Sequence, residues 1–274
     1  MPVISTNTAA NTALRYLNNN SAAQSESLAK LSSGSRIVSA KDDASGLAIA
    51  TSMNADITVL NQAATNVTSG TSVLNTADGA LSNIADILQR MKSLTAQAQS
   101  GSSSTDDLSY IDAEYQQLLG EIDDIATTTA FNGVALLDGT SAYSTGVDFL
   151  VGTASTDTIT VTMGGADTTT LALNGTAITD ATSAATNMDL IDTAITTISA
   201  ARANAGATLS RFEYRGDVIS TSLENLQSAK SAISDVDIAA EQTNFTNAQT
   251  LTSAAIAALG QANSMSQSLL KLLQ

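Results

Sequence analysis

Apolar side chains recur at alternating steps of three and four residues in three long segments of the chain, which is the spacing of a coiled coil. Within each segment, one apolar position repeats every seven residues: Met53, Leu60, Val67, Leu74, Leu81 and Leu88; then Leu108, Tyr115 and Ile122; then Ile191, Ile198, Ala205, Phe212, Ile219, Leu226 and Ile233. The first segment predicts one helix over residues 44–99, about 80 Å long at the standard rise per residue. Together the segments predict three helices packed on one another in a rod.

A shorter seam of the same kind opens the chain. Its two heptad positions hold Leu14, Ser21 and Leu28, and Leu17, Gln24 and Leu31. The seam stops at Gly34, a residue that suits the left-handed conformation of a helix C-cap. In the charged segment that follows, Ser39 and Asp42 have the spacing of a capping box, and Asp42 and Asp43 favour the positive end of the next helix.

Between the second and third long segments the period changes from helical to extended. Residues 158–163 alternate strictly between polar and apolar, and Gly164-Gly165 then predicts a turn before a second extended run over residues 169–173. Asn174-Gly175 is a further turn signal. The predicted fold is therefore mainly α, with long coiled-coil helices formed by both chain ends and the central segments, and with a small β-hairpin insertion.

The composition removes most classes of enzyme. The 274 residues include no Cys and no His, so the chain has no disulfide, no thiolate nucleophile and no histidine that could act as a general base or metal ligand. Asp235, Asp237 and Glu241 lack the central glycine and the twelve-residue spacing of a calcium-binding EF-hand, and are interpreted as capping and intersubunit pairing residues. We expect no enzymatic activity, no cofactor and no metal.

The charge balance disfavours polyanionic partners. With 26 acidic against 11 basic residues the net charge is −15, whereas nucleic acids and anionic membranes require clustered Lys and Arg. The sequence contains no run of about 18 apolar residues, the length that a membrane-spanning helix needs. Residues 1–14 lack the basic and apolar parts of a Sec signal peptide. We expect no nucleic-acid partner, no membrane partner and, if the chain is exported, a route without a cleavable Sec signal.

Both chain ends are free of charged side chains, over residues 1–14 and 242–270. Residues 1–33 contain about seven large apolar side chains, whose burial is too small to offset the conformational entropy lost on ordering this segment within one molecule. We therefore expect the ends to order against neighbouring molecules.

Four ordered motifs and the C-terminal end carry a resemblance to a known family. The motifs are Leu31-Ser-Ser-Gly-Ser-Arg-Ile, Ser39-Ala-Lys-Asp-Asp-Ala-Ser-Gly-Leu-Ala-Ile, Phe131-Asn-Gly-Val-Ala-Leu-Leu-Asp-Gly and Ser234-Asp-Val-Asp-Ile-Ala-Ala-Glu. Over residues 1–150 and 183–274 the chain resembles bacterial flagellin, as a short, near-minimal filament subunit. The resemblance implies an N-terminal inner-core helix and spoke (1–43), outer-core helices (44–139), the β insertion (140–182), an outer-core C-terminal helix (183–231) and a C-terminal spoke and inner-core helix (232–274).

The same resemblance implies roles for individual residues. Polymerisation through the inner core would involve Leu14, Leu17, Leu28, Leu31, Ile256, Leu259, Leu269, Leu270, Leu272 and Leu273. The spokes and helix caps would be formed by Gly34, Arg36, Asp42, Asp43, Asp235, Asp237 and Glu241. A patch matching the pattern recognised by Toll-like receptor 5 consists of Leu88, Gln89, Arg90, Leu94, Gln97 and Glu114.

The expected function is a structural subunit that polymerises with itself into the extracellular flagellar filament for motility. The resemblance implies export by the flagellar type III apparatus and further partners: an export chaperone at the C-terminal segment, the filament cap, hook-associated proteins and host Toll-like receptor 5. The alternative is the hook-filament junction protein, which shares the end motifs. The patch between Leu88 and Gln97 and the short length favour flagellin over this alternative.

Overall fold

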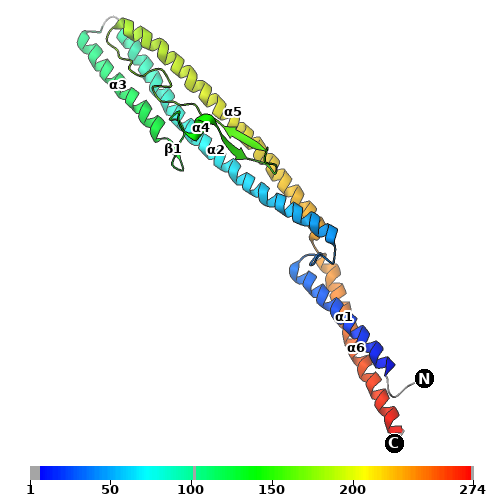
Figure 1. Ribbon diagram of the computed structural model, residues 1–274. Coiled ribbons are helices and arrows are strands. Elements are labelled where there is room, and N and C mark those ends of the chain that lie inside the picture. The colour runs from blue at the N-terminus through cyan, green and yellow to red at the C-terminus, as the bar shows by residue number, and fades with distance from the viewer. Residues whose placement is uncertain (1–6, 101–102, 273–274) are drawn as a thin grey trace. The chain divides into compact units, whose positions relative to one another are not determined.

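The computed structural model describes residues 7–100 and 103–272. The chain divides into two compact units, Met1–Ile57 with Asn225–Gln274 (unit 1) and Thr58–Glu224 (unit 2). Two long helices, α2 (Ala44–Gln99) and α5 (Ala181–Ser234), contribute residues to both units (Figure 1). The bounds of α2 are those predicted from its heptads. The border between the units falls inside α2 and α5, whereas the subdivision into inner and outer core stays a prediction.

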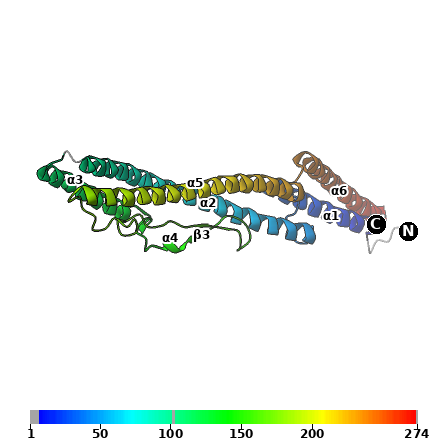
Figure 2. The same ribbon diagram turned by 90° about the horizontal axis from the view of Figure 1, so that it is seen from above.

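Unit 1 is built on α1 (Thr8–Ser33) and α6 (Ile238–Leu272), which lie side by side and antiparallel (Figures 1 and 2). At one end of the pair, Asn7 Nδ2 donates to the Ala262 carbonyl over 3.0 Å. Asn7 also caps α1, because its Oδ1 accepts the Ala10 N–H. The helix ends as predicted at Gly34, which has φ +69° and donates its N–H to the Lys30 carbonyl.

The seam between α1 and α6 differs from the predicted one. The covered side chains of α1 are those of Ala10, Ala13, Leu17, Asn20, Gln24, Ser27, Lys30 and Leu31, and those of α6 are Glu241, Phe245, Ala248, Thr252, Ala255, Leu259, Ala262 and Ser266. The heptad position of Leu17, Gln24 and Leu31 is thus correct. The position of Leu14, Ser21 and Leu28 is wrong, because these residues are exposed. The contact combines a few large apolar side chains, Leu17, Leu31, Phe245 and Leu259, with small and polar residues between them.

Unit 2 contains a helix bundle of α2, α3 (Thr105–Thr128) and α5, as the heptads predicted. Ion pairs connect α2 to both partners: Arg90 with Glu114, Lys92 with Asp192, and Asp78 with Arg202. Buried core residues include Leu74, Leu81, Ile84, Leu88, Met91, Ile111, Tyr115, Ile122, Ile191, Ile198, Phe212 and Ile219. On α3 the buried face also contains Leu119 and Ala126, which lie four residues after Tyr115 and Ile122 of the predicted heptad position.

The β insertion forms a hairpin, but its second strand is not the one predicted. Strand β4 (Thr158–Val161) pairs antiparallel with β3 (Val147–Leu150), which precedes it. The predicted strand at residues 169–173 instead forms turns, in which the Leu171 N–H donates to Asp167 and the Ala172 N–H donates to Thr169. The Thr168 N–H and hydroxyl are held by the Asp123 carboxylate of α3, which diverts this segment from the sheet.

A second, very short hairpin was not predicted from the sequence. Strands β1 (Ala130–Phe131) and β2 (Val134–Ala135) are joined by Asn132-Gly133, with φ of 51° and 79°. Positive φ at both central residues is the geometry of a type I′ turn, for which Asn-Gly is the preferred pair. The turn signal was present in the sequence, but its strands are too short to show alternation.

The β3–β4 hairpin is fixed to the bundle at a few points. Phe149 of β3 meets Phe212 of α5 edge to face, with ring centroids 5.8 Å apart. Asn66 Nδ2 of α2 donates to the Leu150 carbonyl over 2.9 Å. The short helix α4 (Ala142–Thr145) precedes the hairpin. Met163, which follows the hairpin, donates its N–H to the Tyr143 carbonyl of α4. These contacts position the insertion on unit 2.

Candidate functional site

Two short segments connect the end helices to the long ones: residues 34–43 between α1 and α2, and residues 235–237 between α5 and α6. Backbone hydrogen bonds join these two segments and the end of α5. Ser35 forms a β-bridge with Asp235, the Arg36 N–H donates to the Ser234 carbonyl over 2.6 Å, and the Arg36 guanidinium donates to the Ile233 carbonyl over 2.7 Å. The predicted spoke residues Gly34 and Arg36 therefore lie at a junction between the end of α1 and the end of α5.

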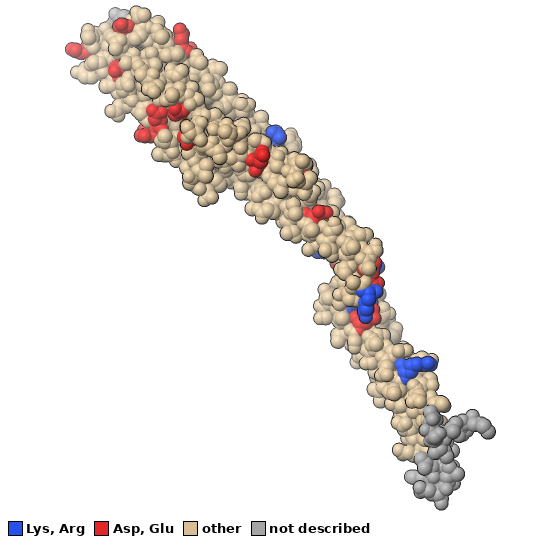
Figure 3. Space-filling model, in the orientation of Figure 1, with Lys and Arg blue, Asp and Glu red and all other residues tan. Residues whose placement is uncertain are grey.

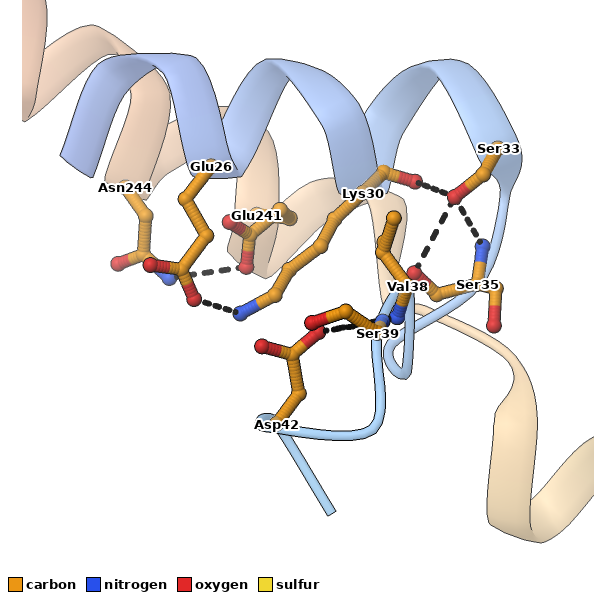
Figure 4. A network of polar contacts seen from close by, with 9 residues as sticks. All are labelled: Glu26, Lys30, Ser33, Ser35, Val38, Ser39, Asp42, Glu241 and Asn244. Carbon is orange, nitrogen blue, oxygen red and sulfur yellow. Dashed lines mark hydrogen bonds and ion pairs between the residues drawn. The ribbon is translucent and has the colours of Figure 1, made fainter. Parts of the chain in front are cut away.

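A polar network lies on one side of this junction, between α1 and α6 (Figure 4). Lys30 Nζ pairs with Glu26 Oε1 over 3.0 Å, and this hydrogen bond raises the pKa of Lys30. The pKa of Glu241 is lowered, first by a hydrogen bond from Ser27 and further by Asn244 and the charge of Lys30. These side chains line a groove of about 350 Å³ between the two helices.

Two helices are capped at their N-termini by acidic residues that the sequence singled out. Asp43 caps α2, because its Oδ1 accepts the Gly46 N–H over 2.8 Å. Asp237 caps α6 by accepting the N–H groups of Ala239 and Ala240 over 2.9 and 3.1 Å. The roles of these two acids as helix caps are thus present in the structure.

Asp42 and Asp235 stabilise the connecting segments instead of capping helices. Asp42 Oδ2 accepts the N–H groups of Ser39 and Val38, and the bond from Ser39 is the main reason that the pKa of Asp42 lies below its ordinary value. The predicted capping box is therefore wrong in one respect: Asp42 accepts the Ser39 N–H, but α2 begins at Ala44 with Asp43 as its cap. The pKa of Asp235 is lowered chiefly by a hydrogen bond from Ser231.

The lowered pKa values make the junction sensitive to acid. A carboxylate with a depressed pKa in the folded state contributes stability that is present above its unfolded pKa and lost as the pH falls through the folded pKa. The ordinary values are 3.8 for Asp42 and 4.5 for Glu241. We therefore expect the helicity of unit 1 to decrease as the pH drops below about 4.5.

Circular dichroism of the full chain, titrated from about pH 7 to about pH 3, measures this decrease. A Glu241→Gln variant should lose part of the acid dependence, while Asp56→Asn, which removes a carboxylate of unit 1 outside the junction, serves as the control. Equal acid dependence in Glu241→Gln and the parent would contradict the assignment.

Large apolar side chains point outward from the helix pair of unit 1. Leu14, Leu28 and Ile256 are exposed by 45%, 55% and 57%, whereas Leu17, Leu31 and Leu259 are half-buried in the pair. Of the remaining predicted residues, Leu269, Leu270 and Leu272 belong to the backbone of α6, but their side chains lie outside the described residues, as does all of Leu273. The exposed face of the pair is a candidate self-assembly surface.

Only some residues of the predicted receptor patch are exposed. Arg90 and Glu114 are exposed and form an ion pair between α2 and α3, with Nη2 and Oε1 2.7 Å apart. Gln89 and Gln97 are also exposed. Leu88 and Leu94, in contrast, are buried in the bundle, so their inclusion in an exposed patch is wrong. Apolar residues at helical spacing face the core here, because α2 is covered by α3 and α5.

Other kinds of site receive no support from the described residues. In residues 7–100 and 103–272, no cluster of acidic side chains has an arrangement that could hold a metal ion. None of the helices described has the length and apolar character needed to cross a membrane.

The end-helix pair leaves large apolar side chains exposed, as expected of a structural subunit that assembles with copies of itself. Two family descriptions match the sequence: "Bacterial flagellin N-terminal helical region" over residues 4–142 and "Bacterial flagellin C-terminal helical region" over residues 188–273. The chain belongs to the bacterial flagellin family. It is accordingly a filament subunit and a structural protein, not an enzyme, and the family implies the extracellular flagellar filament as its location.

Known relatives are similar over most of their length. The chain is 36% identical to the flagellar filament 33 kDa core protein of Treponema phagedenis, with 99% of this chain and 100% of that protein covered. It is 39% identical to a flagellin of Halalkalibacterium halodurans, over 91% of each chain, and 38% identical to a flagellin of Bacillus subtilis strain 168, over 99% of each.

Solved structures share the helical architecture. Bacillus cereus flagellin is similar with 36% identity and a TM-score of 0.50, covering 56% of this chain and 88% of that one. A putative flagellar hook-associated protein from Vibrio parahaemolyticus has a TM-score of 0.59 at 14% identity, over 71% of this chain and 100% of that one. The second likeness concerns the fold alone.

Proposed function

We propose that the chain polymerises through the outward face of its end helices into the filament that drives bacterial swimming. The observation that carries this proposal is the exposure of Leu14, Leu28 and Ile256 on a helix pair whose contact is made by other residues. Burying these side chains between copies removes apolar surface from water, which is the main driving force of protein association. Electron microscopy of purified chain, seeded with filament fragments, tests the proposal, and absence of tubes would overturn it.

The further partners of the chain are part of the same proposal. The flagellar type III apparatus would export the unfolded chain, with a chaperone held at the C-terminal segment, and the filament cap and hook-associated proteins would bind the assembled subunits. The relatives that are 35–39% identical over nearly the whole chain support a filament subunit rather than a hook-filament junction protein. These relatives bear flagellin or filament-core names.

We also propose that the monomer is recognised by Toll-like receptor 5 through the exposed part of its patch, which consists of Gln89, Arg90, Gln97 and Glu114. The Arg90–Glu114 ion pair presents two exposed charged side chains on adjacent helices. The double variant Arg90→Ala, Glu114→Ala removes both charged side chains and should therefore reduce receptor signalling by about tenfold or more. A tenfold loss corresponds to about 1.4 kcal/mol of binding free energy. A reporter-cell assay with monomeric protein measures this loss.

The chain offers a matched control for this receptor test. Lys92 and Asp192 form a second exposed ion pair from α2, one that reaches α5 instead of α3. Lys92→Ala, Asp192→Ala should leave signalling within about twofold of the parent, since an exposed ion pair contributes little to folding. Equal signalling by both double variants would exclude the patch as the recognition surface.

A further inference from the structure

An exposed stripe runs along the outer side of α5 in unit 2. Arg211, Tyr214 and Val218 follow one another at steps of three and four, so they share one face of the helix. Tyr214 is 74% exposed, and Val218 and Arg211 are exposed as well. The neighbouring residues Phe212 and Ile219 are buried in the bundle. Helix α5 thus carries a second patterned face, directed away from its own core.

Arg211 stands out by its electrostatics. By sequence, unit 1 has six basic against seven acidic residues, whereas unit 2 has five basic against nineteen acidic residues. Figure 3 shows acidic side chains spread over the visible face of unit 2. Among the described residues of unit 2, four cations pair with carboxylates of the same chain, and these are Arg90, Lys92, Arg202 and Arg215. Arg211 alone has no such partner there.

A complementary face lies on the outer side of α3. Asp106, Tyr110, Gln117 and Glu121 are all exposed and stand at helical spacing on this face. Tyr110 is 73% exposed, and no large apolar side chain of the described residues except Tyr214 is more exposed. Within the described residues, Asp106 and Glu121 form no ion pair. An exposed tyrosine between carboxylates on α3 therefore matches an exposed tyrosine beside an unpaired cation on α5.

We propose that the α5 face (Arg211, Tyr214 and Val218) docks onto the α3 face (Asp106, Tyr110, Gln117 and Glu121) of a second copy of the chain. Tyr214 packs against Tyr110, and Arg211 pairs with the carboxylates of α3. Because the two faces are different surfaces, the contact is heterologous, and a heterologous contact that does not close into a ring generates an open helical polymer. This contact rests on the proposed function and adds a unit 2 interface to the end-helix surface.

Cross-linking between variants tests the contact. The chain has no Cys, so each variant carries one thiol. Tyr214→Cys and Tyr110→Cys copies are mixed, assembled and treated with a short bismaleimide, because packed tyrosines hold their Cα atoms further apart than a disulfide allows. Mixed dimers should form in the assembled fraction and be absent from the monomer. Val218→Cys provides a second thiol on the same face, and Ser220→Cys, on another face of α5, is the control.

Charge reversal gives an independent readout. Arg211→Glu should raise the concentration needed for assembly by about tenfold, and Arg211→Lys should restore it largely, because the proposed pair depends on charge. Mixing Arg211→Glu with an Asp106→Lys, Glu121→Lys variant should recover part of the assembly.

The outcomes separate the contact from the proposed function. Filaments that show no cross-link between the two faces, or that cross-link equally through Ser220→Cys, overturn the contact and leave the filament role intact. Tyr214→Cys copies that cross-link only with one another would indicate a symmetric contact and also overturn it. If the unmodified chain forms no filaments under any seeded condition, the proposed function fails, and the contact fails with it.

Discussion

Replacing Leu14, Leu28 and Ile256 by serine should prevent filament assembly while leaving the monomer folded. The three side chains are about half exposed on the isolated chain, so covering them in a filament would contribute roughly 1 to 1.5 kcal/mol each. Their combined loss should raise the critical concentration for assembly by about two to three powers of ten. Sedimentation of seeded assembly reactions, with electron microscopy of the pellets, measures this increase.

The control for this triple variant is a substitution on another face of helix α1. Asn19 is exposed on α1, but lies outside the heptad position of Leu14 and Leu28. Asn19→Gln should assemble at the concentration of the parent. Circular dichroism should show the same helicity for both variants and the parent, because exposed residues contribute little to the monomer. Assembly of the triple variant at the parent's concentration would exclude this face as the polymerisation surface.

Replacing Phe212 by alanine should destabilise unit 2 by about 3 to 5 kcal/mol, the usual cost of removing a buried phenylalanine. Phe212 is fully buried, meets Phe149 of the hairpin edge to face, and lies against Gly70 of α2. The substitution therefore weakens the contact between two long helices and the attachment of the β insertion together. Because most domains are stable by only about 5 to 15 kcal/mol, denaturant unfolding of the variant should show a large shift of its midpoint.

A substitution on the opposite helix checks this assignment. A Cβ added at Gly70 would lie 2.6 Å from Phe212 Cζ, so Gly70→Ala should also destabilise unit 2, by about 1 to 3 kcal/mol. The smaller Phe212→Leu side chain should make room for the methyl group, and the double variant should be more stable than the sum of the single changes implies. Strictly additive effects would show that the two residues do not share one packing site. Gly79→Ala, at a helical position where an added Cβ meets no neighbour, is the control.

Much of the architecture was determined by the sequence alone. The heptads of residues 44–99 set the bounds of α2, and the run from Ile191 to Ile233 marks the inward side of α5. Gly34 ended α1 because glycine occupies the left-handed conformation without a steric penalty. These features are local: periodicity and caps act within a few turns of one helix, so neighbouring residues are enough to predict them.

The candidate sites depended on contacts that periodicity does not specify. A heptad pattern says that a residue faces a partner, but not which partner. Leu88 and Leu94 belong to the core because α3 and α5 cover α2. Leu14 and Leu28 are exposed because another face of α1, the one that carries Leu17, faces α6. The strand that pairs with β4 was likewise decided by Asp123, which holds Thr168 in a turn.

The sequence by itself determined that this protein is helical, acidic, free of Cys and His, and similar to flagellin in its ordered motifs. Only the tertiary structure decided which apolar stripes are satisfied within the chain and which are left for other copies. The physical reason is that burial is a property of pairs of surfaces: one helix carries the stripe, but the side chains brought opposite to it, from distant parts of the chain, decide whether water is excluded.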